Sequence, residues 1–255
     1  MRKYVRLIPL LFLPLLLSYV FVVLPNMLLR KILPLSYRYR SLRFVIAILY
    51  AGLRIDLRVQ NPEVSRTTKD AFIVCNHHSF IDPFLIIHLF PHPVRFLAKK
   101  EVRRLALFGD ATASIDALFI NRKSIKSQIT LLKSMKVMLE ARKTNWVVFP
   151  EGTRNREFYS QPLLPFKPGA FKQAMEAKVD ILPMVTYGFQ RVLDKKLHWK
   201  KYPVQIAFLK PITPAMYEGL STREVAELVQ AQMQAESDKL VVEDQRLRVE
   251  LGQTV

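Results

Sequence analysis

An uncharged stretch near the amino terminus limits what this chain can fold into more than any other feature. Residues 7–29 carry no charged side chain and consist almost entirely of Leu, Ile, Val, Phe, Tyr, Met and Pro. A helix of this length would span the roughly 30 Å hydrocarbon core of a bilayer. The stretch therefore predicts a segment that enters a membrane.

A secretory signal peptide is the alternative interpretation, because Arg2, Lys3 and Arg6 would form its positively charged start. A cleavage site with small residues should then follow the apolar run. The chain instead continues directly into Arg30 and Lys31. We therefore favour a membrane segment that is retained.

Three prolines, Pro9, Pro14 and Pro25, disfavour a straight helix because each removes a backbone donor. A second apolar stretch at 44–53 is too short to span, and it follows aromatic and basic residues suited to the headgroup layer. Residues 1–55 are thus predicted to form membrane-anchoring helices. They could be one spanning helix with an interfacial one, or two helices in a single leaflet.

The charge of the chain indicates an anionic partner. Lys and Arg number 39 against 21 Asp and Glu, which gives +18, and no acidic residue precedes Asp56. Nucleic acid, acidic lipid and an acidic carrier protein would all fit this excess. The basic residues are scattered and form no recognisable nucleic-acid-binding module. A nucleic-acid-binding membrane protein is therefore an alternative that only the net charge supports. We expect no nucleic acid partner.

The distribution of charge predicts where in the cell the protein lies, and the cysteine content excludes two kinds of site. More cations follow the apolar run than precede it, which predicts a cell (inner) membrane protein with its bulk on the cytoplasmic side. The single cysteine, Cys75, excludes a disulfide framework and any zinc site of the CxxC type.

Short β-rich runs alternate with helical ones from residue 56 onward. The expected strands cover residues 71–75, 94–98, 117–120, 146–149, 181–187 and 204–209. Helices are expected at 124–143, with the apolar residues Ile125, Ile129, Leu132, Met135 and Leu139 turned inward, and at 222–243, after a capping box of Ser221 and Glu224. The polar middle of the second helix, 230–239, is suited to stand away from the core. The pattern predicts one α/β domain over 56–255.

Residues 76–82, with the sequence NHHSFID, leave the first expected strand and enter a helix. Asp82 before Pro83 could act only as a cap of that helix. It could also reach back to His77, fix the tautomer of the ring and leave the other nitrogen free as a general base. A metal site is the third option, but no familiar ligand spacing supports it.

Further polar residues follow other expected strands. Residues 149–154, with the sequence FPEGTR, include Gly152, which allows close backbone approach, and Arg154, whose planar fork suits a phosphate. A solvent-exposed turn with Glu151 and Arg154 paired is the alternative. Additional cations after strands or turns are Lys99, Lys100, Arg122 and Lys167.

Together these segments resemble the glycerolipid acyltransferase family, particularly the 1-acylglycerol-3-phosphate O-acyltransferases. The resemblance rests on four ordered blocks within about residues 70–190: NHxSFxD at 76–82, FIxR at 119–122, FPEGTR at 149–154 and ILPM at 181–184. It implies a single acyltransferase domain with a mixed sheet flanked by helices, behind the hydrophobic amino-terminal anchor.

The resemblance also implies roles for individual residues. His77 would be the general base and Asp82 its orienting partner. Arg122 and Arg154 would bind the phosphate or glycerol, while Glu151 and Gly152 shape the same site. Pro183 would belong to the acyl-binding block, and Lys99 occupies a position where the family often has lysine.

The implied reaction transfers a fatty acyl group from a thioester to the sn-2 hydroxyl of 1-acyl-sn-glycerol 3-phosphate, forming phosphatidic acid. The donor would be acyl-CoA or acyl-acyl carrier protein, the partners would be lysophosphatidic acid and membrane lipids, and no bound cofactor or metal would be needed. Thioesters are already activated, and the sequence has no GxSxG nucleophile motif.

The second block departs from the family pattern, with Asp116 where glycine is common and Asn121 where aspartate is common. Another lysolipid or glycerol 3-phosphate as acceptor therefore stays open, as does a catalytically silent lipid-binding protein.

Overall fold

The computed structural model describes residues 7–105, 107–121, 123–157, 163–194 and 200–253. Its centre is a seven-stranded sheet in the order β1-β7-β6-β2-β5-β3-β4. The strands are β1 (Ile55–Gln60), β2 (Phe72–Cys75), β3 (Val94–Lys99), β4 (Leu118–Ile120), β5 (Asn145–Val148), β6 (Ile181–Tyr187) and β7 (Tyr202–Phe208). All six strands expected from the sequence are confirmed.

The sheet is mixed, as the family resemblance implies. Neighbouring strands are parallel except for β6 and β7, which are antiparallel. The central strands β2 and β5 are buried on both faces because an apolar cluster covers each side of the sheet. Since β2, β5, β3 and β4 run in one direction, their carboxyl ends meet at one edge, which is where ligands bind in such sheets.

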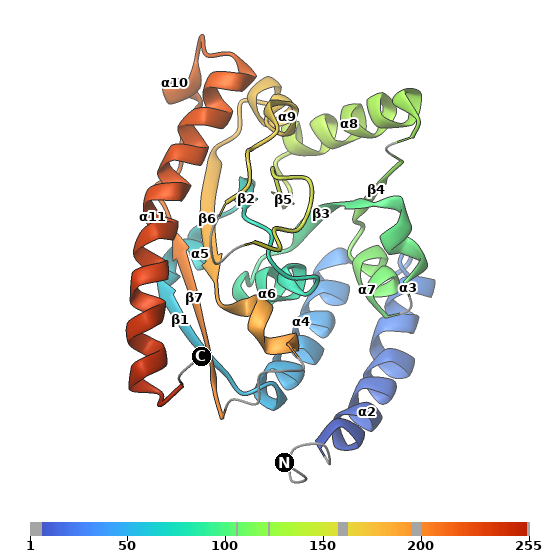
Figure 1. The fold of residues 1–255 in the computed structure, drawn as a ribbon. Helices are drawn as coiled ribbons and strands as arrows, with labels where there is room; N and C mark the ends of the chain where they lie inside the picture. The colour runs from blue at the N-terminus through green and yellow to red at the C-terminus, as the bar shows by residue number, and fades with distance from the viewer. Residues whose placement is uncertain (1–6, 106, 122, 158–162, 195–199, 254–255) are drawn as a thin grey trace.

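Helices cover the sheet on both sides (Figure 1). The described helices after the amino-terminal segment are α5 (Pro62–Thr67), α6 (Asp82–Leu89), α7 (Phe108–Ser114), α8 (Ile125–Glu140), α9 (Lys172–Glu176), α10 (Pro214–Tyr217) and α11 (Thr222–Glu250), with 3-10 turns at Lys100–Arg104, Pro168–Ala170 and Phe189–Leu193.

Helix α11 lies lengthwise along β6 and β7 (Figure 1). The predicted capping box at its start is confirmed, because the Ser221 hydroxyl accepts from the Glu224 amide and the Glu224 carboxylate accepts from the Ser221 amide. The interpretation that the polar middle stands away from the core is wrong. Met233 is buried there in the apolar cluster, and Glu236 and Ser237 are buried beside it.

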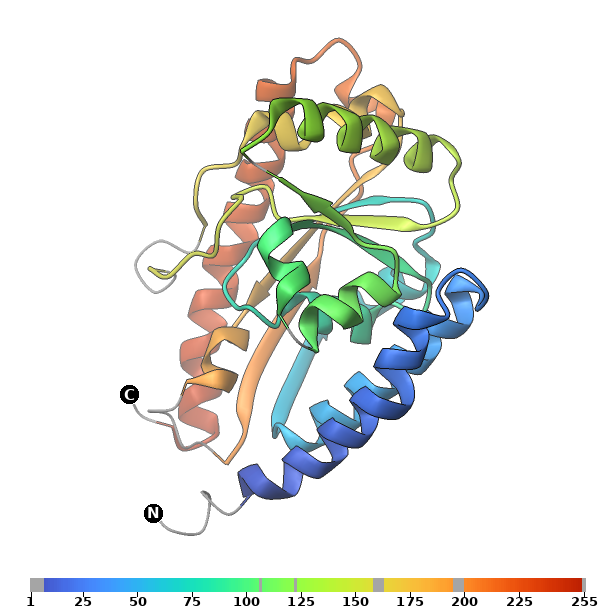
Figure 2. The same cartoon turned by 90° about the vertical axis from the view of Figure 1, so that its right-hand side faces the viewer.

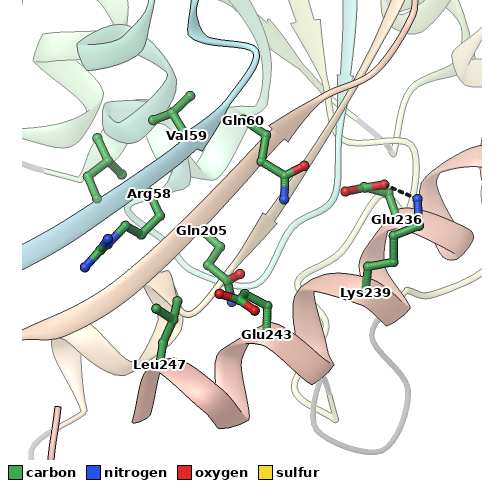
Figure 3. Close-up of a pocket in the computed structure, with 9 residues that line it drawn as sticks. Arg58, Val59, Gln60, Gln205, Glu236, Lys239, Glu243 and Leu247 are labelled. Atoms are coloured by element: carbon green, nitrogen blue, oxygen red, sulfur yellow. Dashed lines mark hydrogen bonds and ion pairs between the residues drawn. The ribbon is translucent and has the colours of Figure 1, made fainter. Parts of the chain in front are cut away.

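A cavity of about 630 Å³ remains between α11 and the strands β1 and β7 (Figure 3). Polar side chains from both sides line it, including Arg58, Gln205 and Glu243. The polar residues of α11 therefore face this space in part.

The prediction that five apolar residues of α8 face inward is only partly confirmed. Met135 and Leu139 are buried, whereas Ile125 and Ile129 are 76% and 50% exposed. The start of α8 follows β4, the last strand of the sheet, which has three residues and offers little surface to cover them.

The amino-terminal stretch forms α2 (Leu7–Ser18), a π-helical turn (Tyr19–Val23) and α3 (Leu24–Leu28), and α4 (Leu35–Gly52) follows. In the described part of the chain, no helix combines the length and apolarity needed to cross a membrane. The expectation of one spanning helix over 7–29 is thus unsupported.

The helices α2 and α4 lie side by side against the domain (Figures 1 and 2). Tyr39, Leu42 and Ile46 of α4 belong to the same apolar cluster as Ile73 and Leu85. Polar contacts add to this packing, because the Tyr19 hydroxyl donates to Asp110 of α7 at 2.8 Å.

Candidate active site

His77 and Asp82 are joined at the point where β2 gives way to α6. The His77 Nδ1 and Asp82 Oδ2 atoms are 2.9 Å apart, as the sequence predicts for a base and its orienting partner. The Asp82 side chain is fully buried, whereas that of His77 is 19% exposed. The His77 ring stacks on Phe149 at a centroid distance of 4.2 Å, so both its orientation and its tautomer are constrained.

Asp82 does more than begin α6. The same oxygen, Oδ2, also accepts hydrogen bonds from the backbone amides of His78 and Ser79, each at 2.8 Å. These donors precede Asp82 in the chain, so its carboxylate holds the loop upstream. The N-cap residue of the helix is Ile81, which makes no side-chain cap hydrogen bond. The interpretation of Asp82 as only a helix cap is therefore wrong.

Glu151 holds the backbone of His77 from the neighbouring strand's loop. Its Oε1 accepts from the His77 amide at 2.8 Å and its Oε2 from the Leu164 amide at 3.2 Å. The Asn155 amide donates in turn to the His77 carbonyl at 2.7 Å. The loop after β5 thus fixes both polar backbone groups of His77, which excludes the solvent-exposed Glu151–Arg154 pair as an alternative.

Burial raises the pKa of the Glu151 carboxyl to about 7, although its two amide donors oppose the shift and the Asp82 charge adds to it. A buried carboxylate is costly without partners, and the two amides supply them here. Near neutral pH, Glu151 can therefore exist in either protonation state.

The backbone conformation at position 152 favours glycine, and the Lys167 side chain lies close to it. Its φ of +70° is one that side chains disfavour, and a Cβ added there would lie 2.9 Å from the Lys167 ammonium nitrogen. The Lys167 side chain therefore lies against Gly152, which directly follows Glu151 in the chain. The sequence indicates Lys167 only as extra positive charge, because it lies 15 positions after Gly152.

Arg154 lies beside the histidine loop. Its guanidinium carbon is 5.8 Å from the centre of the Phe80 ring, and Phe80 packs edge-on against Phe108. Arg154 is exposed, so its fork is available to an anion.

The remaining predicted residues are less closely gathered. Lys99 is the exposed last residue of β3, at the same edge of the sheet. Pro183 is buried within β6 and pairs with Val74 of β2. Arg122 lies outside the described residues. Ser79 and Cys75 are buried, and the Ser79 hydroxyl accepts from the Ile81 amide within the loop.

Sequence reasoning gave no role to two residues that hold the site. Asn155 is buried and bonds the His77 carbonyl, but asparagine in a loop gives no distinctive signal. The Asn76 side chain bonds both backbone groups of Thr186 on β6, at 2.8 and 2.9 Å. Within the described residues, His, Cys, Asp and Glu side chains form no group of three or more that could hold a metal ion.

Comparisons with known proteins agree with this geometry. A family model described as acyltransferase matches residues 56–187. A probable 1-acyl-sn-glycerol-3-phosphate acyltransferase of Mycoplasma pneumoniae is 28% identical over 76% of this chain and 75% of its own length. An uncharacterized acyltransferase of Schizosaccharomyces pombe is 30% identical over 82% of this chain and 74% of its own.

A 1-acyl-sn-glycerol-3-phosphate acyltransferase of Cocos nucifera is 29% identical, and the match spans 69% of this chain but only 56% of the coconut protein. The crystal structure of the 1-acyl-sn-glycerophosphate acyltransferase from Thermotoga maritima has the same fold, with a TM-score of 0.68 over 90% of this chain and 95% of that one, at 20% identity. The chain therefore belongs to the acyltransferase family, among relatives named as 1-acyl-sn-glycerol-3-phosphate acyltransferases.

Proposed function

We propose that this protein transfers a fatty acyl group from a thioester to the sn-2 hydroxyl of 1-acyl-sn-glycerol 3-phosphate and so forms phosphatidic acid. The His77–Asp82 pair carries the proposal. Nδ1 of His77 is held by Asp82, and no described residue hydrogen-bonds its Nε2, which leaves that nitrogen free for a substrate hydroxyl. The relatives' names supply the acceptor.

The chemistry follows from this arrangement. His77 Nε2 removes the proton of the acceptor hydroxyl while its oxygen bonds to the thioester carbonyl carbon. Collapse of the tetrahedral intermediate breaks the carbon–sulfur bond, and the departing thiolate takes the proton back from His77. Asp82 stabilises the imidazolium in between. General base catalysis of this kind contributes on the order of 10² to 10⁴ in rate.

Cations near the base would bind the acceptor phosphate. Arg154 and Lys167 flank the loop that Glu151 ties to His77. Lys99 ends β3 and Arg122 follows β4 in the sequence, and these two parallel strands end at the same edge of the sheet. Charge-assisted bonds from such groups suit a phosphomonoester. The donor is acyl-CoA or acyl-acyl carrier protein, both of which are attracted by a net charge of +18.

We also propose that the protein acts at the cytoplasmic face of the cell (inner) membrane and binds it through α2 to α4. These elements expose many large apolar side chains, which we call the N-terminal apolar face: Leu13, Leu16, Leu17, Val20, Phe21, Leu28, Leu29, Ile32, Tyr37, Phe44 and Ile48. Apolar patches of this kind mark interaction surfaces, and the nearby Arg30, Lys31 and Arg40 favour anionic lipid.

Liposome flotation tests the membrane proposal. Phe21→Asp should reduce binding to anionic vesicles about tenfold or more, because insertion of one phenylalanine contributes roughly 1.5–3 kcal/mol. Val249→Asp is the control, since Val249 is similarly exposed and belongs to α11, a helix that lies across the sheet from α2 in Figure 1. Equal losses in both variants would contradict binding through α2 to α4.

An acceptor panel tests the reaction. Purified protein in mixed micelles is given labelled acyl-CoA or acyl-acyl carrier protein with lysophosphatidic acid, glycerol 3-phosphate or a zwitterionic lysophospholipid. Phosphatidic acid from the first acceptor supports the proposal. Product from another acceptor alone would show that the protein acylates that acceptor in place of lysophosphatidic acid. No product with any of them would indicate a lipid-binding protein without transferase activity.

A further inference from the structure

Apolar and basic side chains lie together on the solvent-facing side of α8. Ile125 and Ile129 are 76% and 50% exposed, and Lys126, Thr130 and Lys133 are exposed as well. Successive positions in this set are one or three residues apart, and the isoleucines are four apart, so the five side chains share one face of the helix. We call these five residues the α8 outer face.

The segment that contains α8 is strongly basic. Residues 123–143 include six Lys and Arg and a single acidic residue, which gives a net charge of +5, whereas α11 over 222–250 has four basic and seven acidic residues and a net charge of −3. Lys136 is paired with Glu140 and Glu176, at 3.8 and 3.3 Å. Within the described residues, Lys126 and Lys133 form no ion pair. These two lysines are therefore available to an anionic partner.

A groove of about 480 Å³ runs beside the α8 outer face. It lies between α8 and Leu118 of β4, and Lys126, Thr130 and Leu131 are among the residues that line it. Three serines of α8 and its cap complete the lining, and their small side chains leave room for those of a partner. A partly apolar surface with a charged rim is typical of protein–protein interfaces.

The first turn of α8 lies at the edge of the sheet where the site lies. α8 begins five positions after β4 ends, and the strands β4, β3, β5 and β2 are neighbours that run parallel. His77 follows β2 at the same edge. Neighbouring strands are about 4.8 Å apart, so the ends of β2 and β4 are separated by roughly 14 Å along the sheet. A partner on the first turns of α8 is therefore close to the base.

We infer that the α8 outer face is the docking surface for an acyl carrier protein that delivers the thioester. The inference rests on the proposed function and deepens it, because it names the carrier as a donor and gives the surface that recognises it. A carrier protein is acidic, so its charge complements Lys126 and Lys133. Its acyl group is attached to a flexible phosphopantetheine arm, which connects the docked protein to His77. Coenzyme A carries the same arm without the protein and does not need this surface.

Two other occupants of the α8 outer face are less favourable. A symmetric contact with a second copy of this chain would bring the lysines of one α8 against those of the other, and like charges across an interface repel. A membrane that contacts the N-terminal apolar face would have to reach the other end of the molecule as well, because α8 and α2 lie at opposite ends in both views (Figures 1 and 2).

The experiment compares full-length wild type with the double variant Lys126→Glu/Lys133→Glu. The matched control is Lys69→Glu/Lys210→Glu, which changes the net charge by the same amount at two exposed lysines. Lys69 precedes β2, and Lys210 follows β7, which runs opposite to β6 and β2, so both lie at the edge of the sheet away from His77. KM and kcat are measured with palmitoyl-acyl carrier protein and with palmitoyl-CoA, each with lysophosphatidic acid as acceptor.

We expect Lys126→Glu/Lys133→Glu to raise the KM for palmitoyl-acyl carrier protein about tenfold, equivalent to about 1.4 kcal/mol. Its kcat and its KM for palmitoyl-CoA should stay within about twofold of wild type, and the control variant should keep all of these constants. Added salt should raise the carrier KM of wild type more than that of the variant, because salt screens exposed charges. Carrier protein without its arm should inhibit transfer from the loaded carrier, and it should inhibit the variant less than wild type.

Three results would overturn the inference while transfer by wild type still supports the proposed function. Equal increases in KM for both donors would indicate that the lysines bind the phosphate that both donors contain. An unchanged carrier KM would exclude docking on this face, and a loss of binding to anionic vesicles in the same variant would assign the face to the membrane. Wild type that uses palmitoyl-CoA alone would exclude the carrier as a donor.

Direct binding separates the inference from the proposed function. If wild type transfers from neither donor, the proposed function fails, and the Kd for fluorescently labelled carrier protein decides the inference. A Kd about tenfold weaker in Lys126→Glu/Lys133→Glu than in wild type and control would support it. Equal Kd values, or no binding by wild type, would overturn it.

Discussion

One carboxylate oxygen of Asp82 accepts three hydrogen bonds, from His77 Nδ1 and from the amides of His78 and Ser79, all within 2.8–2.9 Å. The residue that orients the base therefore also shapes the loop carrying it. Asp82→Asn should retain the fold of the domain but lose the charge that favours the Nδ1–H tautomer. We expect a decrease in kcat of about 10² to 10⁴, measured as initial rates of acyl transfer.

Asp238→Asn is the control for this substitution, because Asp238 is exposed on α11 and bonds only Gln234 in the described residues. It should retain wild-type rates. A rate for Asp82→Asn within about threefold of wild type would argue against an orienting role.

Gly152→Ala should impair the site more than its backbone strain alone would. The substitution forces a Cβ to a φ of +70° and displaces the Lys167 ammonium group. Gly219→Ala is the matched control, since Gly219 has a φ of +78° with open space around it. Both should lose about 1–2 kcal/mol of stability, but only Gly152→Ala should raise the acceptor KM. Similar kinetics for both would show that the Lys167 contact does not matter.

Glu151 should make the stability of the protein depend on pH. Its pKa is about 7 in the folded protein against an ordinary value of 4.5, so the folded protein binds the proton more tightly than the unfolded chain does. The contribution of this proton to the free energy of unfolding is therefore fully present below about pH 4.5 and is lost as pH rises through 7. This contribution is at most about 3 kcal/mol. Glu151→Gln, which cannot titrate, should show a smaller decrease in unfolding free energy between pH 5 and pH 8 in denaturant titrations. Identical decreases would exclude Glu151 as the titrating group.

Arg154→Ala should raise the KM for lysophosphatidic acid about tenfold, since a charge-assisted contact to phosphate contributes about 1.5–3 kcal/mol. The KM for an acceptor that lacks phosphate, such as monoacylglycerol, should not change. Arg156→Ala provides the control because Arg156 is also exposed in this loop. An equal effect of Arg154→Ala on both acceptors would contradict phosphate binding by Arg154.

The sheet was largely predictable because its central strands are continuous apolar runs. β1 was missed, since its sequence, IDLRVQ, alternates charged and apolar residues at an edge of the sheet. The apolar run at 7–29 left open one spanning helix or two helices in a single leaflet, and its prolines disfavoured a straight helix, but where the chain divides into α2, a π-helical turn and α3 could not be predicted. Apolar composition does not reveal that division.

The site divides in the same way between local and distant contacts. His77 and Asp82 are five residues apart in one loop, so their contact could be predicted. Glu151 reaches the His77 amide from 74 residues away, and Arg38 reaches Asp116 from 78. Such pairings depend on how strands and helices pack, which residue spacing does not report.

The most direct test of the central claim is acyl transfer to lysophosphatidic acid by wild type and His77→Ala, assayed side by side in vesicles at matched protein content. We predict phosphatidic acid from wild type and a rate at least about 10² lower for His77→Ala, with vesicle binding unchanged. Phosphatidic acid formed at a comparable rate by His77→Ala would contradict His77 as the base.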